Sequence, residues 1–73
     1  MYTVQVFDRG EPAYYKKVAI GYSGLLSGGF TKDIHTNRNG EAHFDYKDGN
    51  GKIYVEGKVK YEGYISGRIL IYL

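Results

Sequence analysis

The chain contains no cysteine, and this absence excludes disulfide bonds, iron–sulfur clusters and thiolate zinc sites together. No segment approaches the run of about 18 apolar residues that a membrane-spanning helix needs. Met1 leads directly into a strand-like run, without the charged and apolar regions of a signal peptide. We therefore expect a cytoplasmic protein with no membrane partner.

An excess of either charge is also missing. Ten basic and eight acidic residues give a net charge of +2, and the signs alternate locally, as in Lys32-Asp33 and Lys47-Asp48. A surface that binds nucleic acid usually segregates its basic residues. The charge pattern therefore argues against a nucleic-acid partner. With 73 residues, the chain forms a single domain (1–73), whose small core would gain stability from a bound partner.

What the sequence does have is eleven glycines and nine tyrosines, with one proline and no tryptophan. Tyrosine suits half-buried strands and glycine supplies tight turns. Apolar residues alternate with polar ones in the segments 2–6, 14–22, 30–36, 42–46 and 53–61, with a break or bulge at Gly57, and a last strand-like segment covers 65–73. Turn signals lie at 9–12, 36–41 and 48–51. This pattern predicts an all-β fold, a small Greek-key β-sandwich of six or seven short strands.

Two segments resemble the transthyretin-like (prealbumin-like) and carboxypeptidase regulatory-like domains. One is the opening run 4–8, followed by Gly10, Pro12-Ala13 and Val18. The other is the turn and strand at 36–44, which read TNRNGEAHF. The resemblance covers residues 2–46 and implies a prealbumin-like sandwich.

The enzymatic branch of that superfamily hydrolyses 5-hydroxyisourate. It carries a histidine in the first strand and a Tyr-Arg-Gly-Ser tail. This chain has Gln5 at the corresponding position and ends in Ile71-Tyr72-Leu73. It is therefore more similar to the non-catalytic regulatory-like modules. No local motif joins a serine to either histidine, and we expect the protein not to be an enzyme.

The histidines suggest one candidate metal site. If the apolar residues of the 30–46 hairpin share one face, His35 faces His43 across the strands and Asp33 faces Asp45. Imidazole and carboxylate groups so placed would bind a divalent metal. The alternative is a solvated hairpin face with lysines nearby, and on that interpretation the protein has no cofactor.

The candidate interface consists of apolar residues in unusual places. The last strand is apolar on both faces, so it is either central or covered by a partner. Leu25 and Leu26 lie in a Gly/Ser-rich loop, where they either form an interface or plug the core. We expect a binding or structural module that binds protein, including copies of itself, through residues of these two segments: Leu25, Leu26, Ile69, Leu70, Ile71, Tyr72 and Leu73.

A different class of function stays open. Tyrosines and lysines interleave at 14–17 and again at 52–61. Small β-barrels that bind single-stranded nucleic acid stack bases on such aromatic residues within a basic groove. Against this, Glu56 and Glu62 are expected on the same face as Lys58 and Lys60. In the competing interpretation, the tyrosines pack the sheet and the lysines protect its edges.

Overall fold

A computed structural model of the chain describes residues 1–24 and 29–73, and all of the regular structure within these ranges is β-strand. The all-β prediction is confirmed, and the strands pack as two sheets. In chain order they are β1 (Tyr2–Asp8), β2 (Glu11–Pro12), β3 (Lys17–Tyr22), β4 (Gly29–Phe30), β5 (Ile34–His35), β6 (Glu41–Phe44), β7 (Gly49–Val55), β8 (Lys58–Ile65) and β9 (Gly67–Tyr72).

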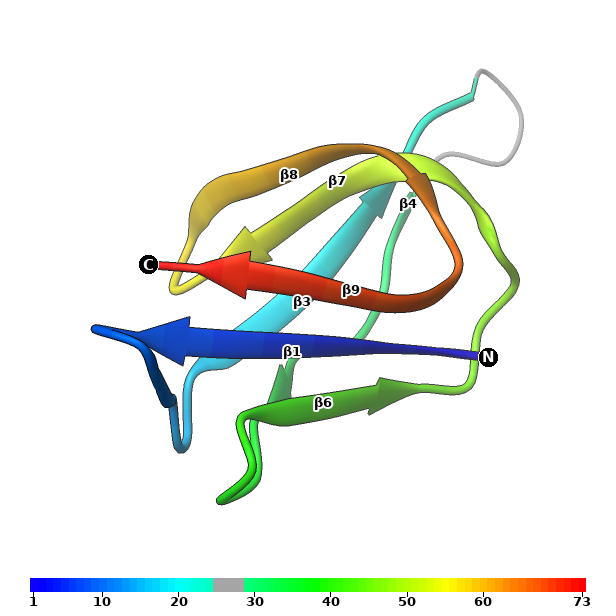
Figure 1. Cartoon of the computed structure of the whole chain (residues 1–73). Coiled ribbons are helices and arrows are strands. Elements are labelled where there is room, and N and C mark those ends of the chain that lie inside the picture. Colours follow the sequence, from blue (N-terminus) through cyan, green and yellow to red (C-terminus); the bar gives the residue numbers. More distant parts are fainter. Residues whose placement is uncertain (25–28) are drawn as a thin grey trace.

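The first sheet, sheet A, is built around β1. On one side β1 pairs antiparallel with β6 and, further along, with β2. On its other side it pairs with β9. In sheet B, β3 and β7 form the centre, β8 extends the sheet beyond β7, and β4 and β5 lie end to end along β3. Figure 1 shows β8, β7 and β3 crossing over β9, β1 and β6.

Period-two alternation creates the core between these sheets. Buried residues occupy alternate positions over most of β1, β3 and β7, because successive side chains of a strand leave opposite faces. The residues with the largest fully buried side chains come from both sheets: Val4, Val6, Val18, Ile20, Phe44, Ile53, Val55 and Ile65. The prediction of a two-sheet sandwich with a core between its sheets is therefore confirmed.

The pairing of β9 with β1 is parallel, a feature that the sequence analysis did not anticipate. Strand β8 ends at Ile65 and β9 begins at Gly67, so the chain passes from sheet B to sheet A within one residue. Gly67 makes this possible with a φ of 59°, in the left-handed region that glycine adopts readily. Both β1 and β9 then run toward the end of the molecule that holds the C-terminus in Figure 1.

The predicted turn at 36–41 is present, but the hairpin around it is not. Gly40 has a φ of 77°, and a Cβ atom there would overlap the carbonyl oxygen of Val6. The strands on either side belong to different sheets, since β5 pairs with β3 and β6 pairs with β1. The prediction of one paired hairpin over 30–46 was therefore wrong.

Other boundaries also shifted. The break at Gly57 is confirmed as a turn in which Glu56 and Gly57 both have positive φ. The turn predicted at 48–51 is instead the start of β7, where Gly51 lets the strand approach β3. A Cβ on Gly51 would lie 2.5 Å from the carbonyl oxygen of Gly21. The predicted strand 30–36 is split, because buried Thr31 accepts the Ile20 N–H through its hydroxyl.

Candidate functional site

The free edge of β9 is the most distinctive feature of sheet A. The N–H of Leu73 donates to the carbonyl of Phe7 at 2.8 Å, and Phe7 stands opposite Tyr72 in the parallel ladder. N–H and C=O groups of a strand alternate between its two sides, so those of Arg68, Leu70 and Tyr72 point away from β1. Within 1–24 and 29–73, no strand pairs with that side of β9.

The side chains of β9 divide between its two faces. Ile71 is buried in the core and Ile69 packs partly against it. On the outer face, Leu70 and Tyr72 keep 46% and 67% of their surface exposed, and Leu73 after the strand is 41% exposed. Of the residues predicted to form an interface, Ile71 therefore belongs to the core, and Leu70, Tyr72 and Leu73 are accessible to a partner.

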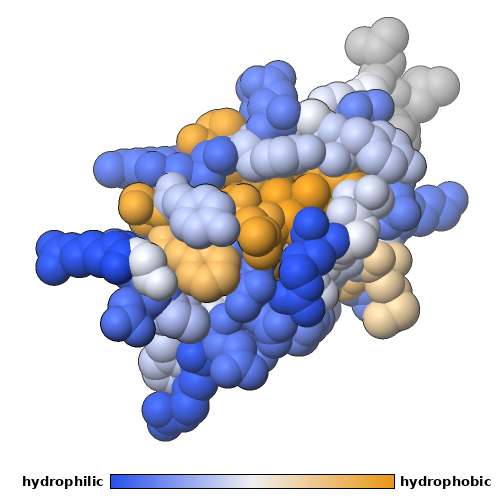
Figure 2. Space-filling view, viewed as in Figure 1, coloured by the Kyte–Doolittle hydropathy of each residue, from blue (hydrophilic) through white to orange (hydrophobic). Residues whose placement is uncertain are grey.

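Aromatic stacking orders the exposed part of this strand. The ring of Tyr72 stacks on that of Phe7 in β1, with 5.1 Å between centroids and 15° between planes. Figure 2, viewed as Figure 1, shows apolar surface gathered in the middle of this face, around β9. The other predicted interface residues, Leu25 and Leu26, lie outside the residues that the structure describes.

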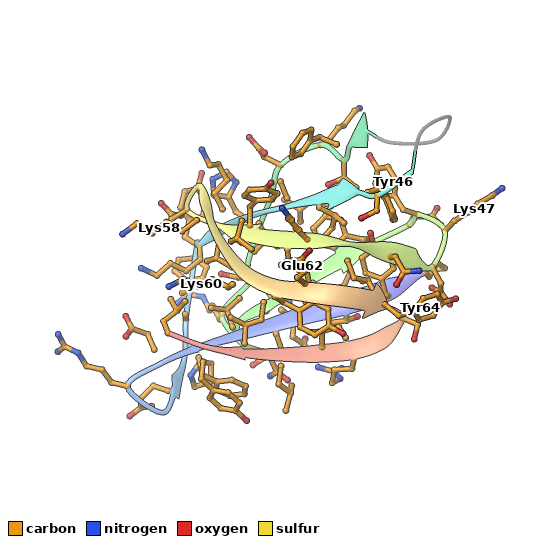
Figure 3. The ribbon with its side chains drawn as sticks, turned by 90° about the horizontal axis from the view of Figure 1, so that it is seen from above. Tyr46, Lys47, Lys58, Lys60, Glu62 and Tyr64 are labelled. Atoms are coloured by element: carbon orange, nitrogen blue, oxygen red, sulfur yellow. The ribbon has the colours of Figure 1, made fainter. Side chains whose placement is uncertain are left out.

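Strand β8 is a free edge of sheet B, and its exposed side chains differ from those of β9. Lys58, Lys60 and Glu62 are exposed along it, and Figure 3 shows their side chains projecting from the strand. Charged side chains, lysine above all, discourage another strand from pairing with an edge. Val59 and Tyr64 are exposed on β8 as well, but they lie among these charges, whereas no charged side chain lies between Leu70 and Tyr72 on β9.

The outer face of sheet A becomes polar toward the start of β9. Arg68 donates to the carboxylate of Glu41 at 2.8 Å and to the side-chain oxygen of Gln5 at 2.9 Å. This hydrogen bond from Arg68 is the main reason why the pKa of Glu41 lies below its ordinary value. The hydroxyl of Thr3 is 2.8 Å from Nδ1 of His43, whose Nε2 is 3.6 Å from Glu41.

The order hydroxyl, imidazole and carboxylate is also the order of a nucleophilic relay. Here, however, the three groups lie on an exposed sheet face, and the His43 side chain is 59% exposed. The imidazole and carboxylate are too far apart for a hydrogen bond, so the carboxylate does not orient the ring as it does in a relay. The cluster is accounted for by cross-strand pairs that tie β1, β6 and β9 together.

The residues predicted to hold a metal are separated by the two sheets. His35 stands opposite Lys17 in sheet B, and His43 stands opposite Thr3 in sheet A. The predicted facing of His35 with His43, and of Asp33 with Asp45, was wrong because β5 and β6 do not pair with each other. In the described ranges, no group of three or more histidine and acidic side chains is placed to hold a metal ion.

An open cleft of about 440 Å³ occupies the end of the molecule opposite the C-terminus. Beneath it, Tyr2 and Tyr22 share a short hydrogen bond between their hydroxyls, and the Tyr22 hydroxyl donates to the carbonyl of Lys47. Burial, followed by the bond to Tyr22, raises the pKa of Tyr2 far above its ordinary value. The cleft is lined by Tyr22, Ser23, Tyr46, Lys47, Asp48, Gly49 and Asn50.

At the other end, three segments bring aromatic and basic side chains together. Tyr14 and Tyr15 precede β3, His35 lies in β5, and Arg38 lies in the turn before β6. Sequence analysis identified the two tyrosines but missed the histidine and arginine. Their contribution depends on β5 pairing with β3, which local sequence patterns do not report.

Comparison with protein-family models, curated proteins and solved structures found no match to this chain. The resemblance to transthyretin-like domains therefore stays a prediction. In the part of the chain that the structure describes, no helix is long and apolar enough to cross a membrane.

Proposed function

We propose that this protein is a non-catalytic module that binds protein through the free edge of β9, and that its first partner is a second copy of itself. The observation that carries this proposal is the combination on one strand of unpaired backbone groups and exposed apolar side chains. Adding a strand to such an edge is a common way for a sheet to bind protein.

The sequence of β9 is self-complementary in one antiparallel register. If Leu70 stands opposite Leu70 of the second copy, Arg68 stands opposite Tyr72. Arg68, Leu70 and Tyr72 point their N–H and C=O groups to the free edge, so each of these groups forms a hydrogen bond with the second copy. On the outer face the leucines meet, and each guanidinium lies beside a tyrosine ring, a favourable cation–π arrangement. On the inner face Ile69 meets Ile71.

Two other properties of the chain favour the pairing of two copies at the β9 edge. The net charge of +2 gives little repulsion between copies. The exposed charges of β8 discourage pairing at that edge, which limits growth to a closed pair rather than a continuous fibre. One pair of strands is a small interface, so we expect a dissociation constant between about 10 μM and 1 mM.

Light scattering after size exclusion tests the proposal, over protein concentrations from about 10 μM to 1 mM. The apparent mass should rise from 8.3 kDa toward twice that value. Leu70→Pro is the sharpest variant, because proline removes only an N–H that points away from β1 and is tolerated on edge strands. It should remain folded and stay at 8.3 kDa throughout.

A second pair of variants supplies a matched control: Leu70→Lys on β9 is compared with Tyr64→Lys on β8. Both residues are exposed, at 46% and 56%, on the two neighbouring edge strands. Leu70→Lys should abolish association and Tyr64→Lys should leave it unchanged. A wild-type mass of 8.3 kDa at every concentration, or equal loss in both lysine variants, would contradict the proposal.

A further inference from the structure

Three aromatic side chains lie together at the end of the molecule that holds the C-terminus, and we call them the aromatic platform: Tyr14, Tyr15 and His35. The Tyr15 ring stacks on the His35 ring, with 4.3 Å between centroids and 22° between planes, and the Tyr14 ring is tilted by 48° with its centroid 5.9 Å from that of Tyr15. The guanidinium of Arg38 sits 5.1 Å above Tyr14. Tyr14 and Tyr15 nonetheless stay 56% and 63% exposed, so the platform presents its rings to solvent.

The backbone holds this platform in place at a cost in strain. Tyr15 has a φ of 59°, a conformation unusual for any residue with a bulky side chain. Buried Thr36 maintains it, because its carbonyl accepts the Tyr15 N–H and its hydroxyl bridges the Lys16 N–H and the Ala13 carbonyl. Strained residues that are fixed by their surroundings are found preferentially at binding sites.

Basic side chains gather at the same end of the molecule. Lys16, which follows Tyr15 in the chain, lines a shallow cleft of about 220 Å³ with Lys58, Lys60 and Glu56, together with Val55 and Leu73. The Glu56 carboxylate already accepts the backbone N–H of Lys17 at 2.6 Å. None of the ion pairs within 1–24 and 29–73 involves Arg38 or any of the three cleft lysines. Figure 3 shows Lys58 and Lys60 at the opposite end from Tyr46 and Lys47.

We infer that this end of the molecule binds single-stranded nucleic acid, with bases stacked on the aromatic platform and adjacent phosphates held by Lys16, Lys58, Lys60 and Arg38. Such a strand offers planar rings and negative charges at regular intervals, which matches the alternation of aromatic and cationic groups here. A duplex hides its base faces within the stack, and an anionic membrane has no rings to stack. This inference is independent of the β9 edge.

Fluorescence anisotropy of a labelled oligothymidylate of about 12 nucleotides tests the inference, at about 20 mM salt and then at increasing salt. Tyr14→Ala should weaken binding about fivefold to a hundredfold. Tyr15→Asn should do the same, since asparagine tolerates positive φ and so preserves the turn. Tyr64→Ala is the matched control, because Tyr64 is also 56% exposed but lies on β8, away from the platform.

The lysines are tested by charge. Lys58→Gln with Lys60→Gln should make the slope of log K against log salt shallower by about 0.7 for each lost phosphate contact. Lys32→Gln with Lys47→Gln gives the same net charge and should leave the slope unchanged. The absence of binding at low salt would overturn the inference. Binding that is weakened equally by the two lysine pairs, or equally by Tyr14→Ala and Tyr64→Ala, would also overturn it. So would equal affinity for an acidic peptide of the same charge.

Discussion

Strands β8 and β9 are consecutive in the chain and each forms a free edge of its sheet, yet their exposed side chains differ. The exposed residues of β8 include the charged Lys58, Lys60 and Glu62 beside Val59 and Tyr64, whereas the second half of β9 exposes only the uncharged Leu70 and Tyr72. Both edges offer unpaired backbone groups, so topology alone does not separate them. The difference in side chains indicates that β8 is protected from association and that β9 is suited to it.

The largest expected effect separates the two faces of β9. Ile71→Ala should destabilise the fold by about 2–5 kcal/mol, because Ile71 is 4% exposed and its removal leaves a cavity. Leu70→Ala should change the stability of the monomer by less than about 0.5 kcal/mol. Thermal unfolding in dilute solution measures both. Similar losses in the two variants would mean that Leu70 belongs to the core rather than to a free surface.

A smaller effect compares one tyrosine from each edge. Tyr72→Ala should cost about 1 kcal/mol through loss of the stack on Phe7, a fall in Tm of roughly 4–8 °C. It should also weaken self-association, since it removes the partner of Arg68 across the interface. Tyr64→Ala on β8 should do neither. A Tyr72→Ala variant as stable and as associated as Tyr64→Ala would remove the distinction between the edges.

The smallest effect concerns the polar start of β9. The hydrogen bond from Arg68 lowers the pKa of Glu41 in the folded chain, so this pair stabilises the fold at pH values above the ordinary pKa of a glutamate. The contribution is lost as the pH falls through the lowered pKa. Arg68→Gln should therefore lose less stability than the unaltered chain as the solution is acidified. Identical pH profiles would show that the pair has no role in stability.

The sequence predicted those features of the fold that depend on neighbouring residues. Alternation identified the buried faces of β1, β3 and β7, and Gly57 correctly marked a turn. It failed where the structure depends on distant segments. The turn at Gly40 was recognised, but local patterns do not show that the strands before and after it enter different sheets. That error produced the incorrect pairing of His35 with His43.

The residues of the candidate sites were likewise predictable from local sequence, whereas their placement in the fold was not. An apolar pattern on both faces of the last strand is visible in the sequence, and it marked all of residues 69–73 without separating Leu70 and Tyr72 from the others. Whether that strand is central or at an edge depends on its parallel pairing with β1, which the sequence does not indicate. Likewise, Tyr14 and Tyr15 were noticed as a pair. The stack on His35 depends on the pairing of β5 with β3 and on the hydrogen bonds of buried Thr36 to the segment that holds Tyr15.

Amide hydrogen exchange at Leu70 and Ile71, followed by NMR as the protein concentration is raised, tests the role of β9 most directly. The Ile71 N–H faces β1 and should be protected at every concentration, whereas the Leu70 N–H faces the free edge. Our account predicts that Leu70 exchanges rapidly at about 10 μM and becomes progressively protected toward 1 mM. Rapid exchange of Leu70 at all concentrations, with Ile71 protected throughout, would contradict the account.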